Sequence, residues 1–104
     1  MKKGDIVSVI FPFTDLSASK RRPALVLYVA DNDVMLSFIT SKVINNGFSV
    51  KILSSSINNL QVDSTIILTK IFTGSRSLIK GKIGEVEKHY YPSINKIIFS
   101  LLSL

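Results

Sequence analysis

The chain has 104 residues, a length that suits one domain, so we expect residues 1–104 to form a single unit. It contains no cysteine and one histidine, which excludes disulfides, thiolate metal sites and thiol nucleophiles and argues against paired imidazole catalysis. The formal net charge of +6 favours a polyanionic partner, such as nucleic acid, an anionic membrane surface or an acidic protein segment.

The first part of the chain is predicted to form short strands. Residues 6–11 and 24–29 are apolar runs rich in β-branched side chains, typical of strands that are buried on both faces. A polar loop is expected between them at residues 13–20, and Pro23 is expected at the first residue of the second strand. An Asp-Asn-Asp turn then leads into a third strand at residues 34–40.

Three more strands are predicted after an Asn-Gly turn. Residues 48–53 alternate between apolar and polar side chains, as a half-buried strand does. Residues 64–73 form a fifth run, in which continuous alternation would put Ile66, Leu68 and Phe72 on one face, and Gly74 is expected to end it. A short strand with an edge or bend at its glycine is predicted at residues 78–83.

The end of the chain has helical periodicity instead. Its apolar stripe consists of Ile94, Ile97, Ile98, Leu101 and Leu102. Pro92 is expected in the first turn, and Glu85 and Glu87 are expected near the positive end of the helix dipole. One helix cannot cover both faces of a flat sheet. The predicted fold is therefore mainly β (α+β): about six short strands curled into a small barrel, with the C-terminal helix packed across it.

Lys20, Arg21 and Arg22, followed by Pro23, form the strongest candidate site. Proline disfavours the α region for the residue before it, so Arg22 is held extended and its guanidinium loses little entropy on binding. The planar guanidinium fork suits a phosphate group. The alternative interpretation is a solvated basic segment, because three consecutive cations are a weak signal alone.

Other candidate groups carry weaker signals. Thr40 and Ser41 place two hydroxyls at a strand end, where they can contact a phosphate or simply reflect β propensity and a turn. His89 could act as a general acid or base, as imidazole side chains do near neutral pH, but it is expected to be a packing residue at the start of the helix. Lys70 and Arg76 flank Phe72, which could stack on a base, although a core position is the favoured interpretation. No motif predicts a metal site or a nucleotide cofactor.

Four segments resemble the MazF/PemK (Kid/CcdB-like) toxin family. They are GDIV at residues 4–7, RRPALVL at 21–27, FITS at 38–41 and DSTIIL at 63–68. Their order and spacing agree with the family from end to end, and the RPALV tract after GD and two hydrophobic residues is the most specific part.

The resemblance implies a small SH3-like barrel that forms a homodimer. The expected location is the cytoplasm, with which the absence of cysteine agrees. Members of the family are toxins of type II toxin–antitoxin systems, and most are metal-independent endoribonucleases that cut single-stranded RNA at short sequences. The resemblance also implies an acidic antitoxin as partner. No membrane span and no cofactor are expected, because the longest apolar tract, residues 97–104, is too short to span a bilayer and no cofactor motif is present. Arg22 and Thr40 match the family's catalytic arginine and threonine. The predicted substrate-binding residues are Ser19, Lys20, Arg21, Ser41, Lys70, Thr73 and Arg76.

The sequence departs from the family pattern in two places. Phe72 stands where many members have a basic residue, and the first loop lacks their Gly-Ser-Glu, so Asp15 is its one carboxylate. Two alternatives therefore stay open beside the nuclease: a non-catalytic SH3-like dimer that binds nucleic acid or an acidic peptide, and a toxin that acts on a protein target.

Overall fold

The fold is seen in a computed structural model, which describes residues 1–10 and 21–104. In this part of the chain six strands form one antiparallel sheet in the order β4-β5-β3-β2-β1-β6. The strands are β1 (Asp5–Ile10), β2 (Arg21–Val29), β3 (Asp33–Thr40), β4 (Ser49–Ile52), β5 (Ser64–Ser75) and β6 (Ile79–Glu85). The other elements are the 3₁₀ turns η1 (Arg76–Leu78) and η2 (Lys88–Tyr90) and the helix α1 (Tyr91–Leu102).

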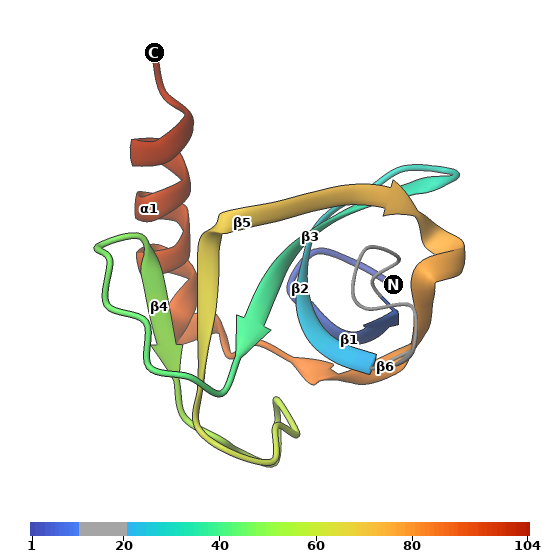
Figure 1. Ribbon diagram of the computed structural model, residues 1–104, viewed down its shortest axis with the longest axis horizontal. Coiled ribbons are helices and arrows are strands. Elements are labelled where there is room, and N and C mark those ends of the chain that lie inside the picture. The colour runs from blue at the N-terminus through green and yellow to red at the C-terminus, as the bar shows by residue number, and fades with distance from the viewer. Residues whose placement is uncertain (11–20) are drawn as a thin grey trace.

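The sheet is curled rather than flat. Figure 1 shows β1, β2, β6 and the second half of β5 wrapping into a barrel, with β4 and α1 to one side of it. The predicted fold class, a small mainly β barrel with a C-terminal helix, is confirmed. Among the described residues, no helix is both long enough and apolar enough to cross a membrane.

Two groups of buried side chains lie on opposite faces of the sheet. One, here called the helix face, packs beneath α1 and includes Ile6, Leu25, Ile39, Ile66 and Ile94. The other, here called the barrel face, lies inside the curl and consists of Val7, Val9, Ala24, Val26, Val34 and Leu36. Because side chains alternate between faces along a strand, β1 and β2 must be apolar at nearly every position, as the sequence predicted.

β5 bends in its middle, and this bend contradicts the predicted alternation. Ser37 of β3 pairs with Ile71, but Phe38 pairs with Ile67, so three residues of β5 fall outside the ladder. The irregularity shifts the phase of the strand. Ile66 therefore lies on the helix face, whereas Phe72 packs against the barrel face. The core position favoured for Phe72 agrees with the structure.

Gly74 does not end β5, which continues to Ser75. Gly74 pairs with Val34, and a Cβ at this position would lie 2.6 Å from the ring of Phe72. The glycine therefore makes room for an aromatic side chain instead of breaking the strand. Pro23 is likewise not the first residue of β2 but the third, because β1 pairs with both arginines that precede it. β4 and β6 differ from the predicted ranges by one or two residues at each end.

The start of α1 differs from the prediction in its acidic residues. Pro92 does lie in the first turn. Glu85, however, belongs to β6, and the carboxylate of Glu87 accepts hydrogen bonds from Asn58 and Ser55 at 3.0 and 3.2 Å. These carboxylates therefore have partners outside the helix. Leu102, the last residue of the predicted stripe, is 65% exposed.

A loop at residues 53–60 crosses β6 beside the helix face. The fully buried Asn58 side chain holds it: its oxygen accepts from the backbone N–H groups of Ser55 and Leu60, and its amide donates to the carbonyl of Leu53. The loop contacts β6 closely enough that a Cβ on Gly84 would overlap its backbone. Glycine is therefore required at position 84 by space.

Candidate active site

Arg21 and Arg22 begin β2 at one end of the sheet. Arg21 pairs with Ile10 and Arg22 with Val9 of β1, whereas pairing with β3 starts only at Ala24. Both arginines are exposed. Arg22 thus has the extended backbone that Pro23 predicts, and it shares a face with Val9, which lies on the barrel face.

Thr40 ends β3 at the same end of the sheet. The last pair between β2 and β3 is Ala24 with Phe38. When this register is continued by two residues along each strand, beyond the last pair, Arg22 falls level with Thr40. Side chains alternate between faces along a strand, so Arg22 shares a face with Ala24, and Thr40 shares a face with Phe38, which is the barrel face in both cases. The two residues predicted to be catalytic, far apart in the sequence, are therefore set at the same level of neighbouring strands.

The hydroxyl of Thr40 is oriented by the turn that follows it. Its Oγ1 accepts a hydrogen bond from the backbone N–H of Lys42 at 3.1 Å. A hydroxyl has one hydrogen to donate as well as lone pairs to accept. With a backbone donor on its oxygen, the hydroxyl hydrogen of Thr40 can point toward an acceptor outside the turn, such as a phosphate oxygen.

The same level of the sheet carries two further residues that the sequence interpretation did not select. Thr40 pairs with Thr65 of β5, and Thr65 pairs with Lys51 of β4. We call this line of side chains, Arg22, Thr40, Thr65 and Lys51, the basic row. Thr65 is buried, and Lys51 is exposed. The outward alternation of Ser49 and Lys51 was a signal for the orientation of Lys51, but its proximity to Thr40 depends on strand pairing.

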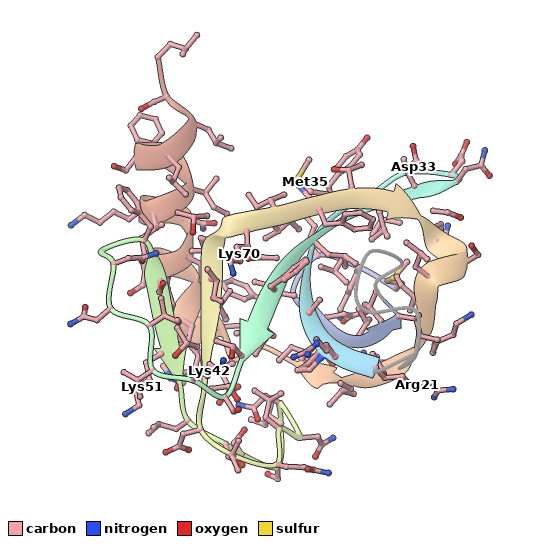
Figure 2. The ribbon with its side chains drawn as sticks, viewed as in Figure 1. Arg21, Asp33, Met35, Lys42, Lys51 and Lys70 are labelled. Atoms are coloured by element: carbon pink, nitrogen blue, oxygen red, sulfur yellow. The ribbon has the colours of Figure 1, made fainter. Side chains whose placement is uncertain are left out.

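Further basic side chains lie near this level of the sheet. In the view of Figure 2, Lys51, Lys42 and Arg21 lie at a similar height in the lower half of the molecule, and Asp33 lies near the top. Ser41, a predicted binding residue, follows Thr40 directly and is exposed. It also lines a cavity of about 370 Å³ that borders the basic row at Lys51 and Thr65.

The other predicted binding residues are placed differently. Thr73 pairs with Met35, five residues along β3 from Thr40, which is roughly 17 Å at 3.4 Å per residue. Arg76 lies further in the same direction, where its guanidinium contacts the carbonyls of Ala30 and Asp31 at 3.5 and 3.4 Å. Within one chain, neither residue joins Arg22 and Thr40.

Lys70 lies at the bend of β5 (Figure 2). Its side chain is exposed. It is nearer to the basic row along β3 than Thr73 is. Ser19 and Lys20, like Asp15 and the predicted loop at 13–20, lie outside the described residues.

His89 belongs to the helix side of the molecule. Its ring lies 4.1 Å from that of Tyr90, centroid to centroid. The Tyr90 hydroxyl in turn accepts from the backbone N–H of Leu53, and its ring packs against the helix face. This agrees with the packing role expected for His89. The described part of the chain holds no group of three or more His, Cys, Asp or Glu residues arranged to bind a metal ion.

A cluster of opposite charges lies at the other end of β1. The buried carboxylate of Asp5 is 3.3 Å from Nζ of Lys82, which is also 3.4 Å from Glu85. Lys2, 3.3 Å from Glu85, lowers the pKa of that carboxylate, and Lys82 lowers it further. Desolvation lowers the pKa of Lys82, but attraction to Asp5 and Glu85 outweighs it, so the net pKa is raised. The cluster joins β1 to β6 and is separate from the basic row.

Comparison with known proteins identifies the family. The sequence matches the family described as PemK-like, MazF-like toxin of type II toxin–antitoxin system, over residues 2–102. The chain belongs to this family. The resemblance in its four short segments is thus confirmed over nearly its whole length. No curated protein matches the chain.

Solved structures of an endoribonuclease and of MazF toxins share the fold. A mycobacterial endoribonuclease in complex with its cognate antitoxin superposes with a TM-score of 0.80 at 16% identity, covering 100% of this chain and 96% of that one. Toxin MazF-mt6 from Mycobacterium tuberculosis gives 0.79 at 19% identity, with 96% and 97% covered. MazF from Deinococcus radiodurans gives 0.77 at 22% identity, with 100% and 97% covered. At these identities the likeness establishes the MazF-like fold.

Proposed function

We propose that this MazF-like toxin is a metal-independent endoribonuclease that cuts single-stranded RNA, with Arg22 and Thr40 as its catalytic residues. Family membership supports the proposal, and structural neighbours are described as endoribonucleases. The observation that carries the proposal is the placement of Arg22 opposite Thr40 at the end of β2 and β3. A guanidinium and an oriented hydroxyl on one face form a site suited to a phosphate diester.

The reaction is a transfer within the RNA strand. The 2′-oxygen attacks the adjacent phosphorus while the bond from phosphorus to the 5′-oxygen breaks. The 2′-hydroxyl loses its proton to a base, and the departing 5′-oxygen gains a proton, so the products are a 2′,3′-cyclic phosphate and a 5′-hydroxyl. Negative charge builds up on the phosphorane oxygens. Arg22 stabilises this charge, and the Thr40 hydroxyl donates a hydrogen bond to one of these oxygens.

The test is cleavage of varied single-stranded RNAs by purified protein in EDTA, with sequencing of the new RNA ends. We expect cutting at defined short sequences, and a loss of about 100-fold or more in kcat for Arg22→Ala, since the lost interaction acts on the transition state. Arg22→Lys should keep only part of the wild-type kcat, because lysine lacks the planar guanidinium fork. Lys96→Ala, which removes one exposed cation from α1, is the matched control.

The same assay separates the alternatives. Intact RNA with wild-type protein contradicts the nuclease, and salt-sensitive RNA binding without cutting indicates a binding module instead. Growth arrest with intact cellular RNA indicates a protein target. Cutting that EDTA abolishes contradicts the metal-independent mechanism while keeping the nuclease.

We propose a homodimer and an acidic antitoxin as the protein partners, and the cytoplasm as the location. Phe99 and Leu102 of α1 are 74% and 65% exposed, and Tyr28 of β2 is 52% exposed, so apolar area remains for a partner to cover. The net charge of +6 favours an acidic one. One structural neighbour is an endoribonuclease in complex with its cognate antitoxin. Light scattering on the purified protein tests the dimer; a monomer at micromolar concentration would contradict it.

A further inference from the structure

Lys51 stands at the far end of the basic row from Arg22, on the edge strand β4. The row is defined by direct strand pairs: Lys51 with Thr65, and Thr65 with Thr40. Directly paired residues point to one face, so the lysine side chain lies on the same face of the sheet as the catalytic pair. Lys51 is exposed, and its ammonium group is therefore available to a ligand on that face.

The spacing of the row suits two phosphates rather than one. β2 and β4 are separated by β3 and β5, so the backbones of Arg22 and Lys51 are about 14 Å apart at roughly 4.8 Å per strand. Arg22 and Thr40, which are level on neighbouring strands, are the residues proposed to contact the phosphate that is cut. Lys51, two strands beyond Thr40, is in position for a neighbouring phosphate of the same RNA strand.

A cavity of about 370 Å³ adjoins Lys51, between β4, the start of β5 and the segment after β3. This volume is within the range of small-ligand sites, which is roughly 300–1,000 Å³. Its polar lining includes two lysines and one carboxylate, and Oδ1 of that carboxylate, on Asp63, already accepts from the backbone N–H of Ser54 at 2.9 Å. The polar and charged residues that line the cavity include Lys42, Asn45, Ser49, Lys51, Asp63 and Thr65.

We infer that Lys51 binds the phosphate next to the one that is cut, and that the adjoining cavity receives the nucleotide attached to it. The inference rests on the proposed function for the identity of the substrate. Lys51 acts as a point charge on a flexible stem. It therefore contributes affinity that is independent of base sequence, whereas the cavity walls contact the nucleotide itself.

The experiment measures binding of an RNA oligonucleotide that contains the mapped cleavage site, with a 2′-deoxy sugar at that site to prevent cutting. In a matched set, one linkage at a time is made a neutral methylphosphonate. For the wild type we expect one neighbouring linkage whose neutralisation weakens binding by roughly three- to tenfold, as suits one exposed charged contact. Lys51→Ala should lose the same factor, become insensitive to that linkage, and lower the salt slope by about 0.7.

Matched variants make the result specific. Lys51→Arg should keep the affinity, and Lys96→Ala, the same loss of charge on α1, should bind as the wild type does. On cleavable RNA, Lys51→Ala should raise KM and leave kcat nearly unchanged, unlike Arg22→Ala. The inference is overturned if Lys51→Ala binds RNA with the affinity and salt slope of the wild type. It is also overturned if neutralising each linkage weakens binding by Lys51→Ala as much as it weakens binding by the wild type. Absence of cutting by the wild type contradicts the proposed function instead, so the two failures are distinct.

Discussion

Replacing Gly84 with alanine should destabilise the protein strongly. Gly84 lies on β6 where the loop at residues 53–60 crosses it. A Cβ at this position would lie 2.6 Å from the carbonyl carbon of Asn58 and from the carbonyl oxygen of Ile57. These are backbone atoms, which cannot rotate away as the end of a flexible side chain can. Gly84 has no left-handed backbone conformation, so the cost of the alanine is steric.

The magnitude follows from the contacts that the loop must give up. Moving it away from β6 breaks the hydrogen bond from Glu85 N to the carbonyl of Ile57, at 3.1 Å, and the one from the Asn59 amide to the carbonyl of Ile83, at 3.0 Å. Two hydrogen bonds at about 1 kcal/mol each, with about 1–3 kcal/mol for overpacking, give about 3–5 kcal/mol. A small domain has about 5–15 kcal/mol of stability in all. At about 4–8 °C per kcal/mol, the Tm should fall by at least about 12 °C.

Urea unfolding followed by circular dichroism measures the effect, and Gly47→Ala is the matched control. Gly47 has a φ of +80°, and no atom lies within 4 Å of its Cβ position. Gly47→Ala should therefore lower the free energy of unfolding only by the cost of a left-handed backbone conformation, about 1–2 kcal/mol. If Gly84→Ala is no less stable than Gly47→Ala, the close contact between loop and strand is refuted.

Three further predictions concern single groups. Thr40→Val should lower kcat for RNA cleavage by about 100-fold, whereas Thr40→Ser keeps the hydroxyl and most of the activity; equal kcat for both would remove Thr40 from the mechanism. Asn58→Ala should lower the free energy of unfolding by about 3 kcal/mol or more, because it leaves several buried partners without hydrogen bonds. The free energy of unfolding should also fall at both ends of the pH range. Folding lowers the pKa of Glu85, so its ionised carboxylate stabilises the fold above the unfolded value of 4.5, and this stabilisation is lost as the pH falls through the folded pKa. Folding raises the pKa of Lys82, so its ammonium group stabilises the fold below the unfolded value of 10.5, and this stabilisation is lost as the pH rises through the folded pKa. Lys82→Met should flatten the alkaline limb, and an unchanged limb would contradict the assignment.

The sequence predicted the elements because each is encoded locally. Apolar runs with turn signals between them located the strands, and a 3.6-residue stripe located α1. The bend of β5 was missed because alternation was continued through residues 68–70, which lie outside the ladder with β3. The phase of Phe72 depends on that register, and register is a property of the partner strand. Gly74 was expected to end the strand because the sequence does not show that the ring of Phe72 occupies the space of a Cβ at position 74.

The candidate site could be predicted only in part, for a related reason. Arg22 was predicted because the proline after it fixes its backbone, and this is a local effect. Thr40 was a weaker candidate, as a hydroxyl at a strand end, and its predicted catalytic role came from the family resemblance. Lys51 and Thr65 carry no local signal for the site, since each meets its neighbour through strands that are distant in the sequence. Only the pairing of β4 with β5, and of β5 with β3, brings them to the level of Thr40.

The placement of the site at strand ends explains how a small domain can hold exposed groups rigidly. The apolar side chains of β2 and β3 are buried on both faces up to Ala24 and Ile39, so the backbones that carry Arg22 and Thr40 are fixed by the core directly behind them. The arginine and threonine then need few contacts of their own, and their polar groups remain open to a substrate. In the proposed site, residues that touch no substrate thus provide the geometric precision, because a preorganised donor stabilises developing charge only if its support does not move.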